Sequence, residues 1–240
     1  MQGYELLAAL DAVQHAFARE ARTVISEHAD WDAKTDERVI VFGKCCNVIA
    51  STKLALFFAS KYLTSAQWWD EFPHIQSDNG PGRSQDFANF VKVSFIQAFF
   101  SLTESAFRRF IRALDPSACA EGSAPFENIY QALLRRVTLD DKPKHIVSLE
   151  VWREIRNAIH NNMVYYHRSG NDKTITYRGD DLLLEIDKPL NFVTWKILVL
   201  LTTDIGTLLT DLVRSPELSS IPTVYGPANF TLGREPEDAS

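Results

Sequence analysis

"SQDFANFVKVSFIQAFFSLTESAFRRFIRAL", residues 84–114, is the stretch that decides the fold. It is apolar on more than one side, which is typical of a helix surrounded by other helices. Ser84 is a suitable N-cap, and Asp86 in the first turn suits the positive end of the helix dipole. The Gly, Pro and Ser residues of 115–125 then end the helix. The stretch therefore predicts the long central helix of a bundle.

Helical periodicity marks further segments on both sides of this stretch. They are 4–28, 36–63, 126–137 and 191–214. Another helix is expected to begin near Ser148, and the Pro, Gly and Asn content of 72–84 predicts a loop. The chain is therefore expected to be mostly helical.

The hydrophobic pattern changes from helical to alternating before the last helix. "KTITYR" and "DLLLEID" flank Gly179–Asp180, a suitable two-residue hairpin turn, and 163–168 is a candidate third strand. The fold class that follows is mainly α, a helical bundle with a small β-hairpin or three-stranded meander inserted before the last helix.

Three regions are expected along the chain. Residues 1–75 form an N-terminal helical segment that packs on the bundle. Residues 83–215 form the bundle itself, with the hairpin at 163–187. Residues 216–240 contain four prolines and end acidic, so this tail is expected to be extended or disordered.

Composition excludes some classes of protein. Hydrophobic residues make up 45% of the 240 residues and charged residues 23%, which is enough for a buried core. The net charge of −6 argues against a protein that coats nucleic acid nonspecifically, although a small basic pocket remains compatible with it. The N-terminus lacks a signal-peptide pattern, and the apolar stretch 195–209 is interrupted by Lys196 and Asp204. A cytoplasmic protein without membrane association is expected.

A polar motif, "REIRNAIHNN" at 153–162, lies on the helix expected after Ser148. At about 100° per residue, Arg153, Arg156, Asn157 and His160 fall on one side of that helix and the aliphatic residues on the other. Solvated helix faces usually carry Glu and Lys. This stripe has no carboxylate to balance its arginines apart from Glu150 and Glu154 at its edges.

These side chains suit cleavage of RNA without a metal. His160 can take the proton from the 2′-hydroxyl beside the scissile phosphate, because imidazole titrates near neutral pH. Arg156 and Arg153 can stabilise the charge that grows on the phosphorane oxygens, and Asn157 can orient the imidazole or the phosphate. No cluster of acidic residues for Mg²⁺ is evident, so no metal and no cofactor are expected.

The motif resembles the signature of HEPN domains, helical bundles marked by an Arg, a following polar residue and a His after four to six intervening residues. The resemblance implies a metal-independent endoribonuclease of a toxin–antitoxin or antiphage system, working as a homodimer with an antitoxin or defence partner. Arg156–Asn157 supplies the Arg-polar pair but lies three residues before His160. Arg153 has the family's spacing but is followed by Glu154. Either arginine therefore remains the candidate.

Other interpretations stay open at this point. A non-catalytic protein that binds nucleotide, RNA or a partner chain would use the same stripe, and so would a polar interface or a buried ion-pair cluster with Glu150 and Glu154. Arg108, Arg109 and Arg112 form a second basic cluster, either a solvated helix face or part of the same cleft. On the second interpretation Arg108 and Arg112 bind RNA, together with Asn161 of the motif.

Overall fold

The computed structural model describes residues 3–71, 80–119 and 124–226, and it confirms a mainly α fold with a small antiparallel hairpin. The elements are α1 (Tyr4–Glu27), α2 (Glu37–Phe58), the π-helix η1 (Ala59–Leu63), α3 (Ala66–Glu71), α4 (Gly80–Leu114), α5 (Phe126–Arg136), α6 (Lys142–Ile159), β1 (Lys173–Tyr177), β2 (Asp180–Leu184), α7 (Trp195–Arg214) and α8 (Pro216–Ser219).

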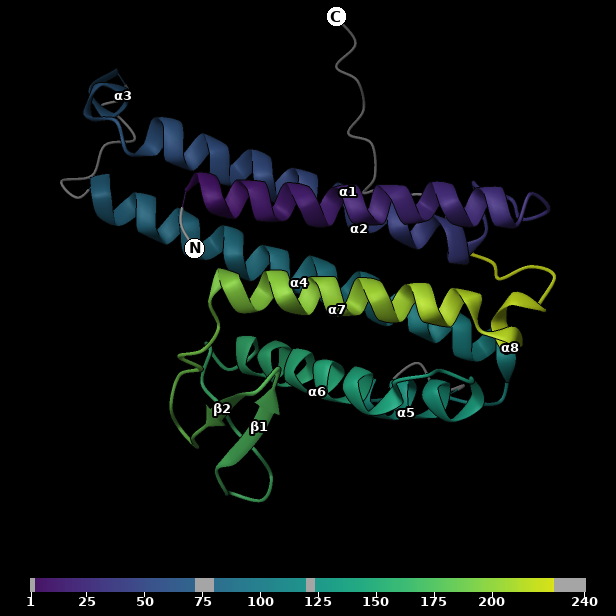
Figure 1. Cartoon of the computed structure of the whole chain (residues 1–240). Coiled ribbons are helices and arrows are strands. Elements are labelled where there is room, and N and C mark those ends of the chain that lie inside the picture. The colour runs from purple at the N-terminus through teal and green to yellow at the C-terminus, as the bar shows by residue number, and fades with distance from the viewer. Residues whose placement is uncertain (1–2, 72–79, 120–123, 227–240) are drawn as a thin grey trace, which may run out of the picture.

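The long helices form three layers (Figure 1). The helices α1 and α2 pack against each other on one side, α4 and α7 lie in the middle, and α5 and α6 lie on the other side. The hairpin packs beside α6 at one end of the molecule. The long stretch quoted above is therefore central, because α4 contacts α2, α5 and α6.

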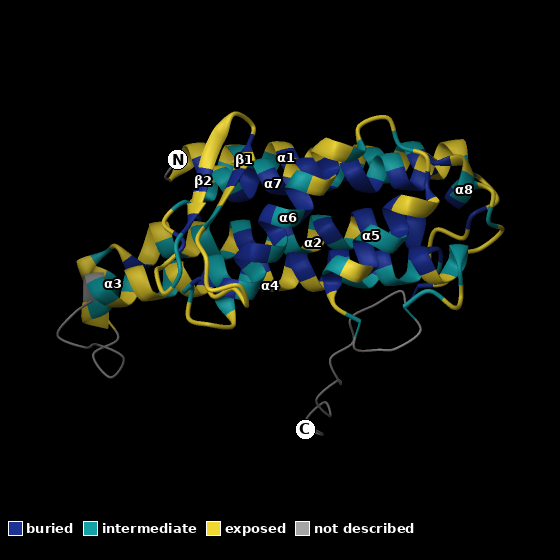
Figure 2. Ribbon diagram, turned by 90° about the horizontal axis from the view of Figure 1, so that it is seen from below, coloured by how far each residue is buried: buried dark blue, intermediate teal, exposed yellow. Residues whose placement is uncertain are grey.

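Aromatic side chains join the layers into one core. The ring of Phe17 on α1 lies 6.4 Å from that of Phe42 and 6.1 Å from that of Phe99 on α4. On its other side α4 meets α6, where the Phe99 and Trp152 rings are 5.8 Å apart. In Figure 2 the buried faces of the helices turn toward one another accordingly. Burial on both sides explains why α4 is apolar around most of its circumference. The division of the chain near residue 75 stays a prediction.

Three helices begin at residues other than those predicted. The helix α4 begins at Gly80, inside the predicted loop 72–84, of which 72–79 lie outside the described residues. The helix α6 begins at Lys142, earlier than Ser148, because the Asp141 carboxylate accepts a hydrogen bond from the Lys144 N–H. Pro143 is tolerated there because the first turn of a helix has no intrahelical partner for its missing N–H. The helix α7 begins at Trp195, later than predicted.

The hairpin forms, but its turn lies one residue earlier than predicted. Tyr177 pairs with Asp180, so Arg178 and Gly179 are the two turn residues, with φ of 53° and 87°. Positive φ at both positions is the geometry that matches the twist of a two-residue hairpin. The predicted third strand at 163–168 is wrong, since that segment makes only an isolated bridge, Val164 with Pro189. The two-stranded alternative is the correct one.

A buried carboxylate on α7 anchors the hairpin. Asp204 accepts hydrogen bonds from the Tyr177 hydroxyl at 2.6 Å, from Arg178 Nη2 at 2.5 Å and from the Ser148 hydroxyl at 3.3 Å. Burial acts to raise the pKa of Asp204, but the bonds from Arg178 and Tyr177 outweigh it and hold that pKa below its ordinary value. The Asp204 that interrupts the apolar stretch 195–209 is thus a structural anchor.

The beginning of the predicted tail is ordered against the start of α2. After α8, the Val224 carbonyl accepts a hydrogen bond from the Glu37 N–H at 2.8 Å, and the Gly226 N–H donates to the Thr35 carbonyl. Arg38 is fully buried and donates to the carbonyls of Leu218 and Ile221. The predicted tail thus begins with a short helix, α8, and its extended or disordered character beyond α8 stays a prediction. Residues 227–240 lie outside the described residues.

One helical stretch of the described chain, Glu37–Leu63, is long and apolar enough to cross a membrane by length and composition alone. A third of its most apolar window is buried inside the protein. Core helices of soluble proteins have the same composition, so the expectation of no membrane association stays a prediction, as does the cytoplasmic location.

Candidate functional site

The helix α6 separates an aliphatic face from a polar face, as its sequence pattern predicts. Trp152, Ile155 and Ala158 are buried against the bundle, and the Trp152 ring packs on Phe99 and Phe100 of α4. This packing fixes the rotation of α6 about its axis. The motif side chains are consequently turned away from α7 and toward the space between α4, α5 and the segment that follows α6.

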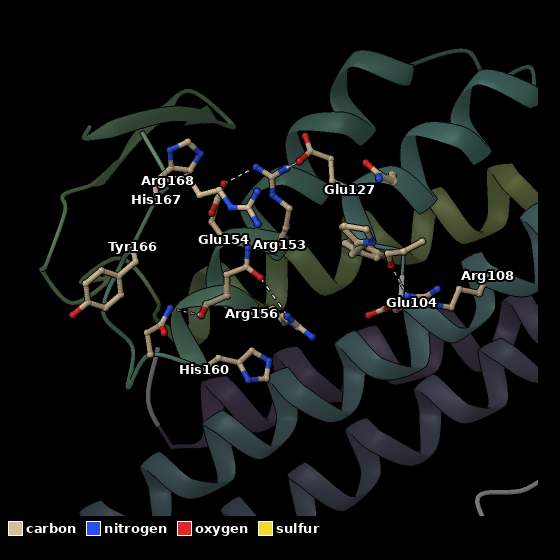
Figure 3. Close-up of a pocket in the computed structure, with 16 residues that line it drawn as sticks. Glu104, Arg108, Glu127, Arg153, Glu154, Arg156, His160, Tyr166, His167 and Arg168 are labelled. Carbon is tan, nitrogen blue, oxygen red and sulfur yellow. Dashed lines mark hydrogen bonds and ion pairs between the residues drawn. The ribbon is translucent and has the colours of Figure 1, made fainter. Parts of the chain in front are cut away.

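A pocket of about 760 Å³ occupies that space (Figure 3). Its walls come from α4, from 124–128 at the start of α5, from 153–161 on α6 and its final turn, and from the loop segment 166–168. All four predicted catalytic residues line it, and so do Arg108 and Asn161. Arg112 is exposed on α4 and does not line the pocket. The tertiary structure thus assembles six of the seven predicted site residues in one place.

Arg153 is held by two carboxylates. Its Nη1 lies 2.5 Å from Glu127 Oε2 on α5, and its Nη2 lies 2.6 Å from Glu154 Oε1. The Arg153 side chain is only 13% exposed and Glu154 only 3%. The stripe was expected to have no balancing carboxylate apart from Glu150 and Glu154. Glu154 does pair with Arg153, and Glu127 is a further partner that was not expected because it comes from another helix.

The ion pairs of Arg153 continue into the hairpin. Lys173 Nζ lies 3.0 Å from Glu154 Oε1 and 2.7 Å from Glu150 Oε1. Burial acts to raise the pKa of Glu154, but hydrogen bonds from Arg153 and Lys173 outweigh it, so the pKa is lowered. Glu154 is therefore ionised at neutral pH and fixes Arg153 in place. Of the two predicted partners of the motif, Glu154 pairs with Arg153, whereas Glu150 pairs with Lys173 and with no arginine of the motif.

Arg156 has no such partner. No carboxylate in the described part of the chain forms an ion pair with it, and Asn157 Oδ1 accepts its only hydrogen bond, at 3.4 Å from Nη1. Its guanidinium lies over the Phe100 ring, 5.2 Å from the centroid. A planar cation supported by an aromatic face keeps its donors available for an anion. Arg156 is therefore the arginine of the motif that is available to a ligand.

His160 lies at the end of α6, as its C-cap, and is exposed to the pocket. Its ring makes no hydrogen bond with any residue that the structure describes. Figure 3 shows Arg156 and His160 together at one end of the pocket, with Arg153 and Glu127 at the other. Asn161 donates from Nδ2 to the Asn157 carbonyl at 3.3 Å. An unconstrained imidazole thus lies next to an unpaired guanidinium.

The turn after His160 directs the chain back over the pocket. Asn162 and Met163 have φ of 54° and 67°, and the Met163 N–H donates to the Ala158 carbonyl at 2.7 Å. The left-handed conformation at two successive residues reverses the chain direction at the end of a helix. Asparagine adopts it more readily than most residues, which gives Asn162 a backbone role that the sequence analysis did not assign.

Several residues of the pocket were missed by sequence reasoning. Tyr166, His167 and Arg168 are exposed and line it, although His167 was given no role and 163–168 was assigned to a strand. The only signal was their position directly after the motif. Glu104 and Glu127 were missed as pocket residues because they come from α4 and α5, and nothing in their local sequence relates them to the motif.

Arg108 and Arg109 point in different directions. Arg108 lies in the pocket wall, where it pairs with Glu104 at 2.6 Å and donates to the Ala124 carbonyl at 2.7 Å. Arg109 instead faces the start of α2, where its Nε lies 3.5 Å from Glu37 Oε2. The second basic cluster is therefore split, and only Arg108 belongs to the pocket.

Comparison of the chain with family models, with curated proteins and with solved structures finds no match.

The pocket combines four arginines with three glutamates. Two of the arginines are paired within it, whereas Arg156 and Arg168 form no ion pair with any carboxylate of the described segments. The same segments contain no group of three or more His, Cys, Asp or Glu side chains placed to hold a metal ion. The pocket therefore has a positive end at Arg156 and His160 that suits an anion such as a phosphate.

Proposed function

We propose that the pocket binds RNA and that the protein is a metal-independent endoribonuclease. The observation that carries the proposal is the unpaired Arg156 beside the exposed His160 in one open pocket. Guanidinium is the side chain best suited to a phosphodiester, and imidazole is the one best suited to proton transfer near neutral pH.

The proposed reaction uses the nucleophile that RNA itself carries. His160 takes the proton from the 2′-hydroxyl, and the 2′-oxygen attacks the adjacent phosphorus as the bond to the 5′-oxygen breaks. Arg156 stabilises the negative charge on the non-bridging oxygens of the phosphorane. The departing 5′-oxygen takes a proton from water, and the products are a 2′,3′-cyclic phosphate and a 5′-hydroxyl. Asn157 positions the Arg156 guanidinium through the hydrogen bond described above.

The biological setting is also a proposal. A ribonuclease of this kind fits a toxin or antiphage effector controlled by a partner protein, and the resemblance to HEPN domains favours a homodimer in the cytoplasm. The exposed position of His160 at the end of α6 leaves room for a second copy to face it. Size-exclusion chromatography with light scattering measures whether the dimer exists.

A second function is favoured by the pairing of Arg153. This arginine has the spacing of the HEPN signature, yet two carboxylates neutralise it. The alternative to catalysis is therefore a protein that binds RNA or nucleotide without cleaving it, for which Arg156 alone is sufficient.

Cleavage of labelled RNA in EDTA separates the two functions. We expect the wild-type protein to cleave RNA and to leave 2′,3′-cyclic phosphate ends, and we expect His160→Ala to bind the same RNA without cutting it. Arg112→Ala is the matched control, because Arg112 is exposed outside the pocket. Binding without cleavage by the wild type supports the non-catalytic function, and equal cleavage by His160→Ala contradicts the proposed mechanism.

A further inference from the structure

Glu127 is a pocket carboxylate whose position resembles that of a bound anion. It lies in the first turn of α5 and lines the pocket, and its Oε2 contacts Arg153 Nη1 at 2.5 Å. Its other oxygen accepts a hydrogen bond from Gln131 Nε2 at 3.1 Å. The N-cap residue of α5 is Pro125, whose side chain makes no capping hydrogen bond. Glu127 thus contacts a guanidinium from the first turn of α5, where the helix dipole also favours negative charge.

The two carboxylates on Arg153 differ in how easily they can leave. Glu154 is 3% exposed and also pairs with Lys173, so it cannot leave Arg153 for water without breaking two ion pairs inside the protein. Glu127 is 46% exposed, so water replaces the arginine when its side chain rotates away. Only the contact with Glu127 is therefore exchangeable.

A phosphate can take the place of this carboxylate. Both groups accept hydrogen bonds from the same edge of a guanidinium. Arg168 lines the same pocket, is exposed, and has no ion-pair partner among the residues whose structure is described. Figure 3 shows Glu127 and Arg153 at the end of the pocket away from His160. A phosphate at this end is therefore separate from the one beside His160.

We infer that Glu127 is an internal anion that covers a second phosphate site, formed by Arg153 and Arg168, and that a further phosphate of a bound chain displaces it. The inference rests on the proposed function of the same pocket. Glu127 then determines specificity, because a ligand with one phosphate fills only the Arg156 end. A chain with several phosphates fills both ends.

The test compares Glu127→Gln with Glu150→Gln, which removes the same charge. Glu150 pairs with Lys173 in the same ion-pair network but does not line the pocket. The ligands are a fluorescent 2′-O-methyl hexanucleotide, which lacks the nucleophile, and adenosine 5′-monophosphate, both titrated in EDTA. We expect Glu127→Gln to bind the hexanucleotide about fivefold more tightly, with an affinity that depends more steeply on salt. We expect its affinity for the monophosphate to rise by less than about twofold. We expect Glu150→Gln to leave both affinities unchanged.

Three outcomes overturn the inference. The first is that Glu127→Gln binds the hexanucleotide with unchanged or lower affinity. The second is that Glu150→Gln gains as much hexanucleotide affinity as Glu127→Gln does. The third is that Glu127→Gln gains equal affinity for the hexanucleotide and for the monophosphate. The proposed nuclease function is judged separately, by cleavage of unmodified RNA. If Glu127→Gln binds the hexanucleotide more tightly but the wild type cleaves no RNA, the second phosphate site is supported and the proposed catalysis is contradicted.

Discussion

Arg153 and Arg156 lie one helical turn apart on α6, and we expect the replacement of Arg153 to affect mainly stability and that of Arg156 mainly RNA binding. Arg153→Ala removes the cation between Glu127 and Glu154, two contacts of 2.5 and 2.6 Å. Arg156→Ala removes a cation that no described carboxylate pairs with. The first change should therefore lower the free energy of unfolding, and the second should lower the affinity for RNA.

The magnitudes follow from the contacts. Leaving a buried carboxylate unpaired costs roughly 3–5 kcal/mol, but Lys173 stays 3.0 Å from Glu154, so we expect about 2 kcal/mol for Arg153→Ala. Arg156→Ala loses its contact with Phe100, worth about 0.5–1 kcal/mol. Charged hydrogen bonds to a phosphate are worth about 1.5–3 kcal/mol, so RNA affinity should fall roughly tenfold to a hundredfold.

Urea unfolding followed by circular dichroism measures the first effect. With a slope of about 2 kcal/mol per molar urea, the midpoint for Arg153→Ala should fall by about 1 M, and that for Arg156→Ala by less than half of this. Fluorescence anisotropy with labelled RNA in EDTA measures the second effect. Arg112→Ala, on the exposed side of α4, should change neither quantity.

A reversed pattern of effects would contradict the roles assigned to the two arginines. A stable Arg153→Ala protein would mean that the ion pairs with Glu127 and Glu154 contribute nothing to folding. An Arg156→Ala protein that unfolds early, or that binds RNA as well as the wild type does, would mean that Arg156 is a structural residue.

Three further predictions concern the framework of the site. Asp204→Asn weakens the hydrogen bonds that anchor Arg178 and the hairpin, so unfolding free energy should fall by about 2 kcal/mol and amide exchange in 173–184 should rise. Because folding lowers the pKa of Glu154, its ionised carboxylate stabilises the folded protein above the ordinary glutamate pKa. This stabilisation is lost as the pH falls through the pKa that Glu154 has in the folded protein. Stability measured by urea unfolding should therefore drop as the pH falls below the ordinary glutamate pKa of 4.5, and less steeply in Glu154→Gln. A Cβ at Gly226 would clash with the buried Glu37 carboxylate, so Gly226→Ala should lower the melting temperature by about 4 °C.

Most of the fold could be predicted because hydrophobic periodicity is a local property of the chain. The helical segments and the hairpin are visible in the spacing of apolar residues, and the crowded apolar surface of 84–114 indicates a central helix. The errors fall at the ends of elements, where single residues decide. Asp141 extends α6 toward the N-terminus, and positive φ at Arg178 moves the hairpin turn.

The motif was predictable for the same reason. Residues three and four apart share a helix face whatever the rest of the protein does, so Arg153, Arg156, Asn157 and His160 were certain to be neighbours if α6 formed. The sequence by itself determined the helices, the polar stripe and the chemistry that its side chains offer.

Only the tertiary structure decided which of these side chains is free. Arg153 is neutralised by Glu127 from α5 and by a buried glutamate that Lys173 of the hairpin also holds, whereas Arg156 meets an aromatic ring. Ion pairing depends on distances of a few ångströms between elements far apart in the chain, and no local spacing encodes them. Packing of Trp152 against α4 fixes the rotation of α6, and that rotation directs one arginine to carboxylates and the other into the open pocket.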